Sequence, residues 1–457
     1  MSHRTGSAGR AFQLGCIALG ILAAQAVTAR ELPSLVHAQA GRVGAAVPGV
    51  ESAYDALRLI PSSIPDGLGG PGQKVVIDNG AQEDFFGWSV AIDGSTAVLG
   101  AYGVTVNGHT QQGAAYVFTE ADGIWTLAAT LTADDGAPFD IFGSEVSLSG
   151  TVAAIGAYQA DHSRGAVYVF TGSGGQWTQK ARLAADDGAS QDCLGWSVAV
   201  SDSTVIAGAP FAIVDNRQTG AVYVFAPVGG AWGQRQKLTA SDAQLGDFFG
   251  DAVAIDGATA VIGADSATVD GHVVQGAAYV FDGTSGSWTE QAKLTSDDGA
   301  AYDNFGRSVA VSGATALIGA PYASSYEGAA YVFDGNGTDW HPGQKLLASD
   351  GAPDGYFGWS VALSGDLALV GAGSYSDQNP GHAYVFARSG GVWSETDEKS
   401  SGDGAGADYF GWSVAVSGTN ALVGEPIATV GANYAQGAAF FYGGSDDVIF
   451  ANGFDTD

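Results

Sequence analysis

Pairs of aspartates five residues apart recur along the chain, and paired carboxylates are the side chains here best suited to hold a cation. The candidate metal ligands are Asp135 with Asp140, Asp187 with Asp192, and Asp298 with Asp303. Two carboxylates with nearby carbonyl oxygens could bind Ca²⁺ weakly, but a tight site needs about six to eight oxygens. Aspartate also caps turns by accepting backbone N–H bonds. We favour turn capping and keep weak Ca²⁺ binding as the alternative.

Motifs for catalysis are missing from the sequence. It has no Gly-x-Ser-x-Gly segment between a strand and a helix, no His-Glu-x-x-His and no cluster of Cys and His. Cys193 is the one cysteine outside the segment 1–29, and we interpret it as a small buried hydrophobic residue. We therefore expect no enzymatic activity and no cofactor.

The aspartates belong to a sevenfold repeat with a period of 52 to 56 residues. The glycines of its Phe-Gly pair (once Leu-Gly) are Gly87, Gly143, Gly195, Gly250, Gly306, Gly358 and Gly411. A second glycine follows each of them after 13 residues in all seven copies. Only the next step varies, from 9 to 13 residues, up to the glycine before a Tyr-Val-Phe segment. Such a period with one variable joint is typical of a radial array of identical units.

Each unit contains four short β-segments, which in the first repeat are 87–92, 97–100, 114–118 and 125–131. The turn Asp93-Gly94 joins the first two as a hairpin, and no amphipathic helical pattern occurs after residue 70. Repeated four-strand units of this length predict an all-β, seven-bladed β-propeller over residues 73–442.

The two ends of the repeat region show how the ring closes. The seventh repeat stops at Tyr442 without a fourth segment, whereas residues 73–78 form an extra fourth segment before the first repeat. We expect this N-terminal strand to complete the last blade. All six lysines of the chain fall in fourth segments, where we expect them to protect the outer edges from strand addition.

The variable step indicates where a ligand would bind. In a propeller, the loop between strands two and three and the loop between strand four and the next strand one lie on the same face. The longest variable loops belong to repeats one, four and seven, and repeats one and seven are neighbours after closure. Tyrosine, asparagine and carboxylates suit adaptable recognition of sugars or proteins, and our candidate ligand-binding residues in these loops are Tyr102, Asn107, His109 and Tyr434.

Four tryptophans directly follow the Phe-Gly glycine: Trp88, Trp196, Trp359 and Trp412. A platform for carbohydrate is one interpretation of these rings. Packing between blades is the interpretation we favour, because the rings lie at the start of the first strand.

The segments Phe305-Gly306-Arg307-Ser308-Val309-Ala310 and Leu317-Ile318-Gly319-Ala320-Pro321 resemble FG-GAP repeats. Such repeats build the β-propeller of integrin α-subunits and of many secreted bacterial proteins. The resemblance covers roughly residues 73–442 and implies extracellular recognition or adhesion. Integrin-type blades often carry a calcium loop between strands one and two, but the constant 13-residue step leaves no room for one here.

Composition indicates a secreted protein without nucleic-acid partners. Residues 1–29 have the pattern of a signal peptide, residues 30–72 that of a disordered lead-in, and residues 443–457 form a C-terminal tail. The formal charge is −31, and loss of Arg4 and Arg10 with the signal would make it −33. Such a charge disfavours nucleic acid and anionic membranes. We expect a monomeric propeller without a transmembrane segment, binding an extracellular protein or glycan. The alternative is a lyase or hydrolase acting on extracellular polysaccharide.

Overall fold

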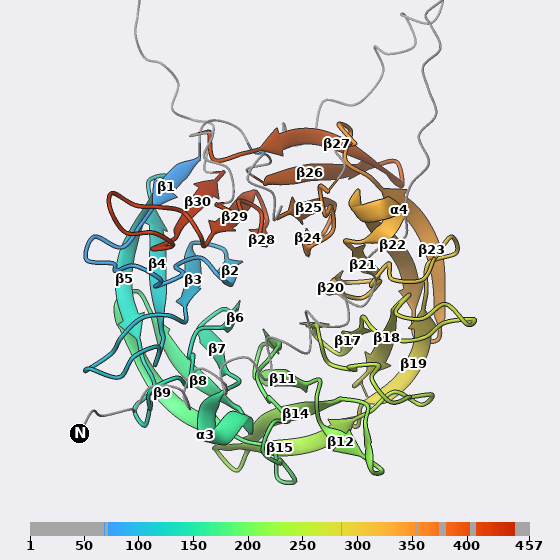
Figure 1. Ribbon diagram of the computed structural model, residues 1–457, viewed down its shortest axis with the longest axis horizontal. Coiled ribbons are helices and arrows are strands. Elements are labelled where there is room, and N and C mark those ends of the chain that lie inside the picture. Colours follow the sequence, from blue (N-terminus) through green and yellow to red (C-terminus); the bar gives the residue numbers. More distant parts are fainter. Residues whose placement is uncertain are drawn as a thin grey trace, which may run out of the picture. The chain divides into compact units, whose positions relative to one another are not determined.

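The protein forms a ring of seven four-stranded antiparallel sheets (Figure 1). The computed structural model describes residues 68, 72–284, 286–351, 354–373, 381–402 and 408–443. The signal peptide at 1–29, nearly all of the lead-in at 30–72 and the tail beyond residue 443 lie outside the described residues. The predicted seven-bladed β-propeller is confirmed.

Each blade contributes four strands, numbered along the chain. Blade 1 consists of β2 (Val90–Asp93), β3 (Thr96–Ala101), β4 (Ala114–Ala121) and β5 (Ile124–Leu131). Blade 2 consists of β6 (Glu145–Ser149), β7 (Val152–Ala157), β8 (Ala166–Ser173) and β9 (Gln176–Leu183). Blade 3 consists of β10 (Val198–Ser201), β11 (Thr204–Ala209), β14 (Ala221–Val228) and β15 (Ala231–Leu238). Blade 4 consists of β16 (Val253–Asp256), β17 (Thr259–Ala264), β18 (Ala277–Asp282) and β19 (Thr289–Leu294).

The remaining blades follow the same order. Blade 5 consists of β20 (Ser308–Ser312), β21 (Thr315–Ala320), β22 (Ala329–Asn336) and β23 (Asp339–Leu346). Blade 6 consists of β24 (Ser360–Ser364), β25 (Leu367–Ala372), β26 (His382–Ser389) and β27 (Val392–Lys399). Blade 7 consists of β28 (Ser413–Ser417), β29 (Asn420–Glu425), β30 (Ala438–Tyr442) and β1 (Gln73–Val75). Loops between second and third strands also carry β12 (Ile213–Val214), β13 (Arg217–Gln218) and the single turns α3 (Ala160–Ser163) and α4 (Ala323–Tyr326).

Closure of the ring uses the N-terminal strand as predicted. Strand β1 pairs with β30, with Gln73 opposite Phe441 and Val75 opposite Ala439. The Gln73 side chain also donates to the Trp125 carbonyl at 2.7 Å and accepts from the Trp125 N–H at 2.8 Å. The last blade is therefore fastened to the first by main-chain pairing and by a side-chain clasp.

The hydrophobic core lies between neighbouring blades rather than inside any one sheet. The core cluster at the first interface combines Val98 and Val117 of blade 1 with Val146 and Ile155 of blade 2. Phe142, from the Phe-Gly pair at that interface, is fully buried and packs edge-on against Tyr168. Burying a large apolar side chain stabilises the fold by roughly 1.5–3 kcal/mol, so the repeated interfaces supply the stability of a ring without disulfides.

A closed circle of hydrogen bonds joins the turns between first and second strands, on the face opposite the variable loops. One side chain in each turn accepts a bond from a backbone N–H in the next turn. The seven bonds run from Asp93 to Gly150, Ser149 to Asp202, Ser201 to Gly257, Asp256 to Gly313, Ser312 to Gly365, Ser364 to Gly418 and Ser417 to Gly94. Neighbouring blades are therefore tied to each other on this face too.

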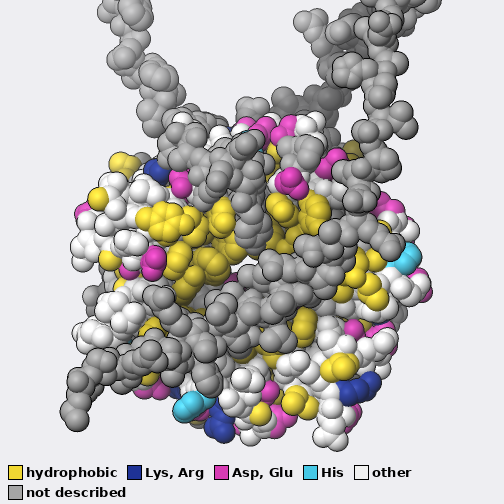
Figure 2. All heavy atoms as spheres, viewed as in Figure 1, with side chains coloured by type: hydrophobic (Ala, Val, Ile, Leu, Met, Phe, Trp, Pro, Cys, Tyr) yellow, Lys and Arg dark blue, Asp and Glu magenta, His cyan; other side chains and the backbone are white. Residues whose placement is uncertain are grey.

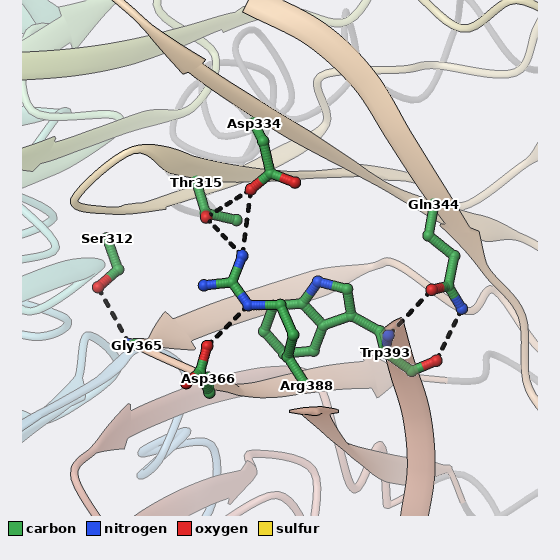
Figure 3. Close-up of polar contacts among 8 residues, drawn as sticks. All are labelled: Ser312, Thr315, Asp334, Gln344, Gly365, Asp366, Arg388 and Trp393. Carbon is green, nitrogen blue, oxygen red and sulfur yellow. Dashed lines mark hydrogen bonds and ion pairs between the residues drawn. The ribbon is translucent and has the colours of Figure 1, made fainter. Parts of the chain in front are cut away.

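Figure 3 shows one sector of this opposite face, where Arg388 links blades 5 and 6. Its guanidinium donates to Asp366 at 2.7 Å and to Thr315 at 3.0 Å, and it lies over the ring of Trp393 at 5.1 Å from the ring centroid. Arg388 therefore holds the two neighbouring blades together.

Candidate functional site

The variable loops are anchored on the next blade and do not extend freely. In the first of them, the carbonyls of Thr110, Gln111 and Gln112 accept hydrogen bonds of 2.8 to 3.1 Å from the N–H groups of Phe139, Ile141 and Phe142. In repeats two to five and in repeat seven, carbonyls at the end of the variable loop likewise accept hydrogen bonds from backbone N–H groups near the next Phe-Gly pair. The second half of each of these loops is therefore part of the scaffold, and the half nearer its tip is left to vary.

His109 belongs to this anchoring system. Its Nδ1 lies 3.0 Å from both the Gly136 carbonyl oxygen and Gln112 Oε1. His272 repeats the arrangement with Gly299 and Gln275, and the Asn433 side chain makes the equivalent bonds to Gly80 and Gln436. A carbonyl oxygen can only accept, so Nδ1 of His109 carries the proton and is occupied within the protein.

The other three candidate residues lie in two different settings. Asn107 is exposed at the loop tip, in the left-handed region with φ of 52°. Tyr434 is 56% exposed, and its backbone oxygen accepts from Glu83. Tyr102 is half-buried and stacks on Phe85, with ring centroids 4.8 Å apart and planes 12° apart. All four candidates therefore lie in variable loops, Tyr102 at the start of its loop beside Trp88, and Asn107, His109 and Tyr434 farther along theirs.

An arc of five side chains, one from each of five consecutive blades, lies at the loop-face end of the innermost strands. We call Trp88, Trp412, Trp359, Arg307 and Asp251 the axial arc. Centroids are 4.6 Å apart for Trp88 and Trp412, and 4.9 Å apart for Trp412 and Trp359. The Arg307 guanidinium lies 5.0 Å from the centroid of Trp359 and 2.6 Å from the Asp251 carboxylate. Figure 2 shows hydrophobic side chains gathered around the central opening of the ring.

Further aromatic rings extend the axial arc outward. Phe85 and Tyr102 both contact Trp88, at 6.0 and 4.8 Å between centroids, and Tyr409 stacks on Trp412 at 5.6 Å. Trp88, Trp412 and Tyr409 are half-buried, so part of each ring faces solvent or a ligand. The expected packing between blades is present, and it assembles an aromatic surface as well.

The polar end of the arc carries carboxylates that are costly to ionise. Asp265 is buried beside Asp251 and Arg307, and it accepts hydrogen bonds from Ser266 at 2.9 Å and Asn304 at 3.3 Å. Burial, together with the charge of Asp251, raises the pKa of Asp265 well above its usual value. Sequence reasoning missed this cluster because each of its members occurs in one repeat only.

Glu145, the first residue of β6, carries the same electrostatic cost. Burial raises the pKa of Glu145 to about 8, against the opposing effects of Ser89 and Arg307. Five other repeats have serine at this position: Ser89, Ser197, Ser308, Ser360 and Ser413.

We expect Glu145→Ser to stabilise the propeller, and more strongly at high pH. Because folding raises the pKa of Glu145, this residue does not lower the free energy of unfolding below about pH 4.5, where it is protonated in both states. The free energy of unfolding then falls as pH rises, and the loss is complete once pH has passed about 8. The gain should be on the order of 2 kcal/mol at pH 9 and should shrink towards pH 5. Chemical denaturation of both proteins at pH 5, 7 and 9 measures it. A gain independent of pH would contradict the electrostatic origin.

The two aspartates of each pair have different structural roles: the second caps a turn, and the first binds a cationic side chain. Asp140, Asp192 and Asp303 accept the N–H of Ala137, Ala189 and Ala300 at 2.7 to 2.8 Å, as expected for turn caps. Burial raises the pKa of all three against these hydrogen bonds.

The other members of the pairs bind cations of the next blade. Asp135 contacts Arg182 at 3.2 Å, while Asp187 and Asp298 accept from Lys237 and Lys345 at 2.7 and 2.6 Å. Asp187 also accepts from Tyr223 at 2.8 Å and Asp298 from Tyr331 at 2.8 Å. Although burial acts the other way, the hydrogen bonds from lysine and tyrosine lower the pKa of Asp187 and Asp298.

These contacts give three of the lysines a role beyond the expected protection of the outer edges. Lys237, Lys293 and Lys345 turn back onto the tyrosines of their own blades, 5.1 to 5.4 Å from the ring centroids, and pair with aspartates. They fasten blades together, in addition to placing charge at the edges. Within the described residues no three or more Asp, Glu, His or Cys gather as a metal site. None of the helices in those residues is long and apolar enough to cross a membrane.

Comparison with known families decides the relationship that the spacing indicated. A family model described as FG-GAP repeat matches seven segments: 72–118, 125–170, 177–225, 232–281, 288–333, 340–386 and 393–442. The chain belongs to the FG-GAP repeat family. In this FG-GAP propeller each matched segment begins in the outer strand of one blade and ends in the third strand of the next, so every match spans an interface between blades.

Other comparisons add little to this FG-GAP assignment. No curated protein sequence matches the chain. Among solved structures, one titled "Crystal structure of the Saccharomyces cerevisiae Sqt1" aligns with a TM-score of 0.42 and 12% identity. That alignment covers 82% of this chain and 99% of the other.

Proposed function

We propose that this protein is a secreted or cell-surface recognition module that binds an extracellular glycan or protein on the variable-loop face. The observation that carries the proposal is the axial arc, in which three tryptophans lead to an arginine and carboxylates around one axis. Aromatic faces with a few convergent polar groups are typical of binding sites, because the rings supply contact area and the polar groups supply orientation.

Family and composition support the same proposal. FG-GAP repeats are typical of extracellular proteins, and the segment 1–29 has the composition of a signal peptide. A formal charge of −31 opposes nucleic acid and anionic surfaces as partners. The anchored loops also favour binding, because a rigid scaffold lowers the entropy lost on association.

An extracellular polysaccharide lyase or hydrolase is the second candidate. The buried carboxylate of Asp265 and the half-buried carboxylate of Glu145 favour it, because perturbed pKa values occur at catalytic sites as well as in structural networks. Asp251 already holds Arg307, and the pairing uses both charges within the fold. We therefore place binding first.

An array of extracellular glycans and matrix proteins, run beside turnover assays on acidic and neutral polysaccharides, separates the two candidates. We expect retention of at least one ligand without cleavage of any polysaccharide. Cleavage that disappears in Asp265→Asn would establish the enzyme in place of the recognition module. A protein that neither retains nor cleaves any member of the panel would contradict both candidates.

A further inference from the structure

Strand β5, the outer edge of blade 1, differs from the other outer strands because it carries no charged residue. Its sequence is Ile124-Trp125-Thr126-Leu127-Ala128-Ala129-Thr130-Leu131. A strand edge presents unpaired N–H and C=O groups, and charged side chains discourage other strands from pairing with them. The other six outer strands each carry one lysine: Lys74, Lys180, Lys237, Lys293, Lys345 and Lys399. The edge of β5 lacks this protection, and none of the described strands pairs with it on its outer side.

The pairing register shows which charge is missing from the middle of β5. Thr130 lies opposite Tyr116 of the same blade. The corresponding residues of the other outer strands are all charged: Lys74, Arg182, Lys237, Lys293, Lys345 and Glu398. Thr130 therefore leaves an uncharged stretch of edge where every other blade has a charge.

Leu127 is a second departure, at the interface with blade 7. It lies opposite Phe118, and the corresponding residues of the other long outer strands are Gln179, Gln234, Glu290, Pro342 and Glu395. Four of these side chains accept a backbone N–H of the preceding blade, at 2.8 to 3.0 Å. Leucine cannot accept a hydrogen bond, and Leu127 is 49% exposed. An apolar side chain thus lies where other blades have a polar link.

The open part of this edge can be delimited. The Gln73 side chain already bonds the N–H and carbonyl groups of Trp125, so the edge from residue 127 to residue 131 is the part left for another strand. Main-chain groups and an exposed leucine lie together there. Such an edge fits an added strand, because main-chain hydrogen bonds supply affinity and apolar side chains supply selectivity.

The chain leaves blade 7 beside this edge. Phe441 of β30 stacks on Trp125 of β5, with ring centroids 4.3 Å apart and planes 7° apart. Residues 444–457 follow, and their apolar, β-prone run is Val448-Ile449-Phe450-Ala451, directly after Asp446 and Asp447. The four residues 444–447 can span about 13 Å, which brings this run to β5.

We propose that residues 448–452 add to the outer edge of β5 as a fifth strand of blade 1. A tether of a few residues gives an effective concentration of about a millimolar. A separate molecule has no such advantage, and an edge of eight residues, about 26 Å long, is too small for the roughly 800 Å² per partner of a standard interface. The tail is therefore a better occupant than a second copy of the chain. The added strand lies on the outer flank of the ring and does not depend on the proposed function.

Hydrogen exchange followed by mass spectrometry on the full chain tests this docking, with a synthetic peptide of residues 444–457 as the unprotected reference. The test variant combines Leu127→Gln with Thr130→Lys, which are the residues of blade 3 at these positions, Gln234 and Lys237. The control is Val392→Gln, because Val392 is an exposed apolar residue at the start of the outer strand of blade 6. Melting curves check that both variants remain folded.

We expect the amides of residues 448–452 to exchange at least about tenfold more slowly in the protein than in the peptide. The double variant should lose this protection, and Val392→Gln should keep it. Exchange at the rate of the peptide, or protection that survives the double variant, would overturn the proposal. Protection that falls on dilution of the protein would assign the edge to a second copy and overturn docking of the tail.

Discussion

A chain that begins at residue 80 should fail to form a stable propeller. A chain that begins at residue 66 should have the same Tm as the full chain. The shorter chain lacks β1, so β30 becomes an exposed edge that invites pairing with other chains. It also loses Lys74, which lies 3.5 Å from Glu425, a carboxylate with 0% side-chain exposure. Removing Lys74 takes a cation away from this buried carboxylate, and a buried charge that loses its counter-charge destabilises the fold.

Circular dichroism melts and size-exclusion chromatography of the two truncations measure this effect. The chain from residue 66 is the control, because it keeps β1 and Leu68, which packs in the blade 7 core cluster. We expect aggregation, or a Tm lower by at least about 10 °C, for the chain from residue 80. Equal melting of the two would show that the N-terminal strand does not close the ring.

Gly263→Ala should be among the most damaging single substitutions in the molecule. A Cβ at Gly263 would lie 2.0 Å from the carbonyl oxygen of Gly306 in the next blade. Both groups are backbone, so neither can rotate away, and overpacking of this kind costs about 3 kcal/mol or more. The matched control is Gly233→Ala, because no atom lies within 4 Å of the Cβ position at Gly233.

Urea denaturation of the two glycine variants gives the comparison. Gly233→Ala should stay within about 0.5 kcal/mol of the unaltered protein, while Gly263→Ala should unfold at much lower urea. A Cβ at Gly100 or at Gly319 would likewise lie 2.0 Å from a carbonyl oxygen of the next blade, that of Gly143 or Gly358 respectively. A mild effect at Gly263 would mean that the blades are not packed backbone to backbone.

Spacing was sufficient to predict the fold, because every step between landmark residues except the variable loop is constant, and strand pairing and blade packing fix these steps. The closing strand could be predicted too, since residues 73–78 repeat the fourth segment and pair with β30. The FG-GAP resemblance rests on the same glycines, which the structure places where blades meet. A short-range pattern copied seven times is robust to differences in any one copy.

The candidate site could be predicted only in part. Repetition reveals what the copies share, whereas Arg307 and Asp251 each occur once and come from different repeats. Tyr102 was found because it lies in a variable loop, and it contacts Trp88 of the axial arc. The structural role of His109 could have been predicted from the sequence, because the pair His109 and Gln112 recurs at the same spacing as His272 and Gln275. A pair that recurs at constant spacing indicates scaffold rather than ligand binding.

The most direct test of whether the axial arc is the recognition site uses the array of extracellular glycans and matrix proteins. It compares how tightly the variants Trp88→Ser and Ser312→Ala bind the ligands that the unaltered protein retains. Repeat two has Ser144 at the position of Trp88, so Trp88→Ser is compatible with the fold, and Ser312 lies in the turns of the opposite face. We expect Trp88→Ser to weaken binding of every retained ligand at least about tenfold, as for a central tryptophan in an interface. Ser312→Ala should leave affinity unchanged. Full affinity in Trp88→Ser, or loss confined to Ser312→Ala, would contradict recognition through the axial arc.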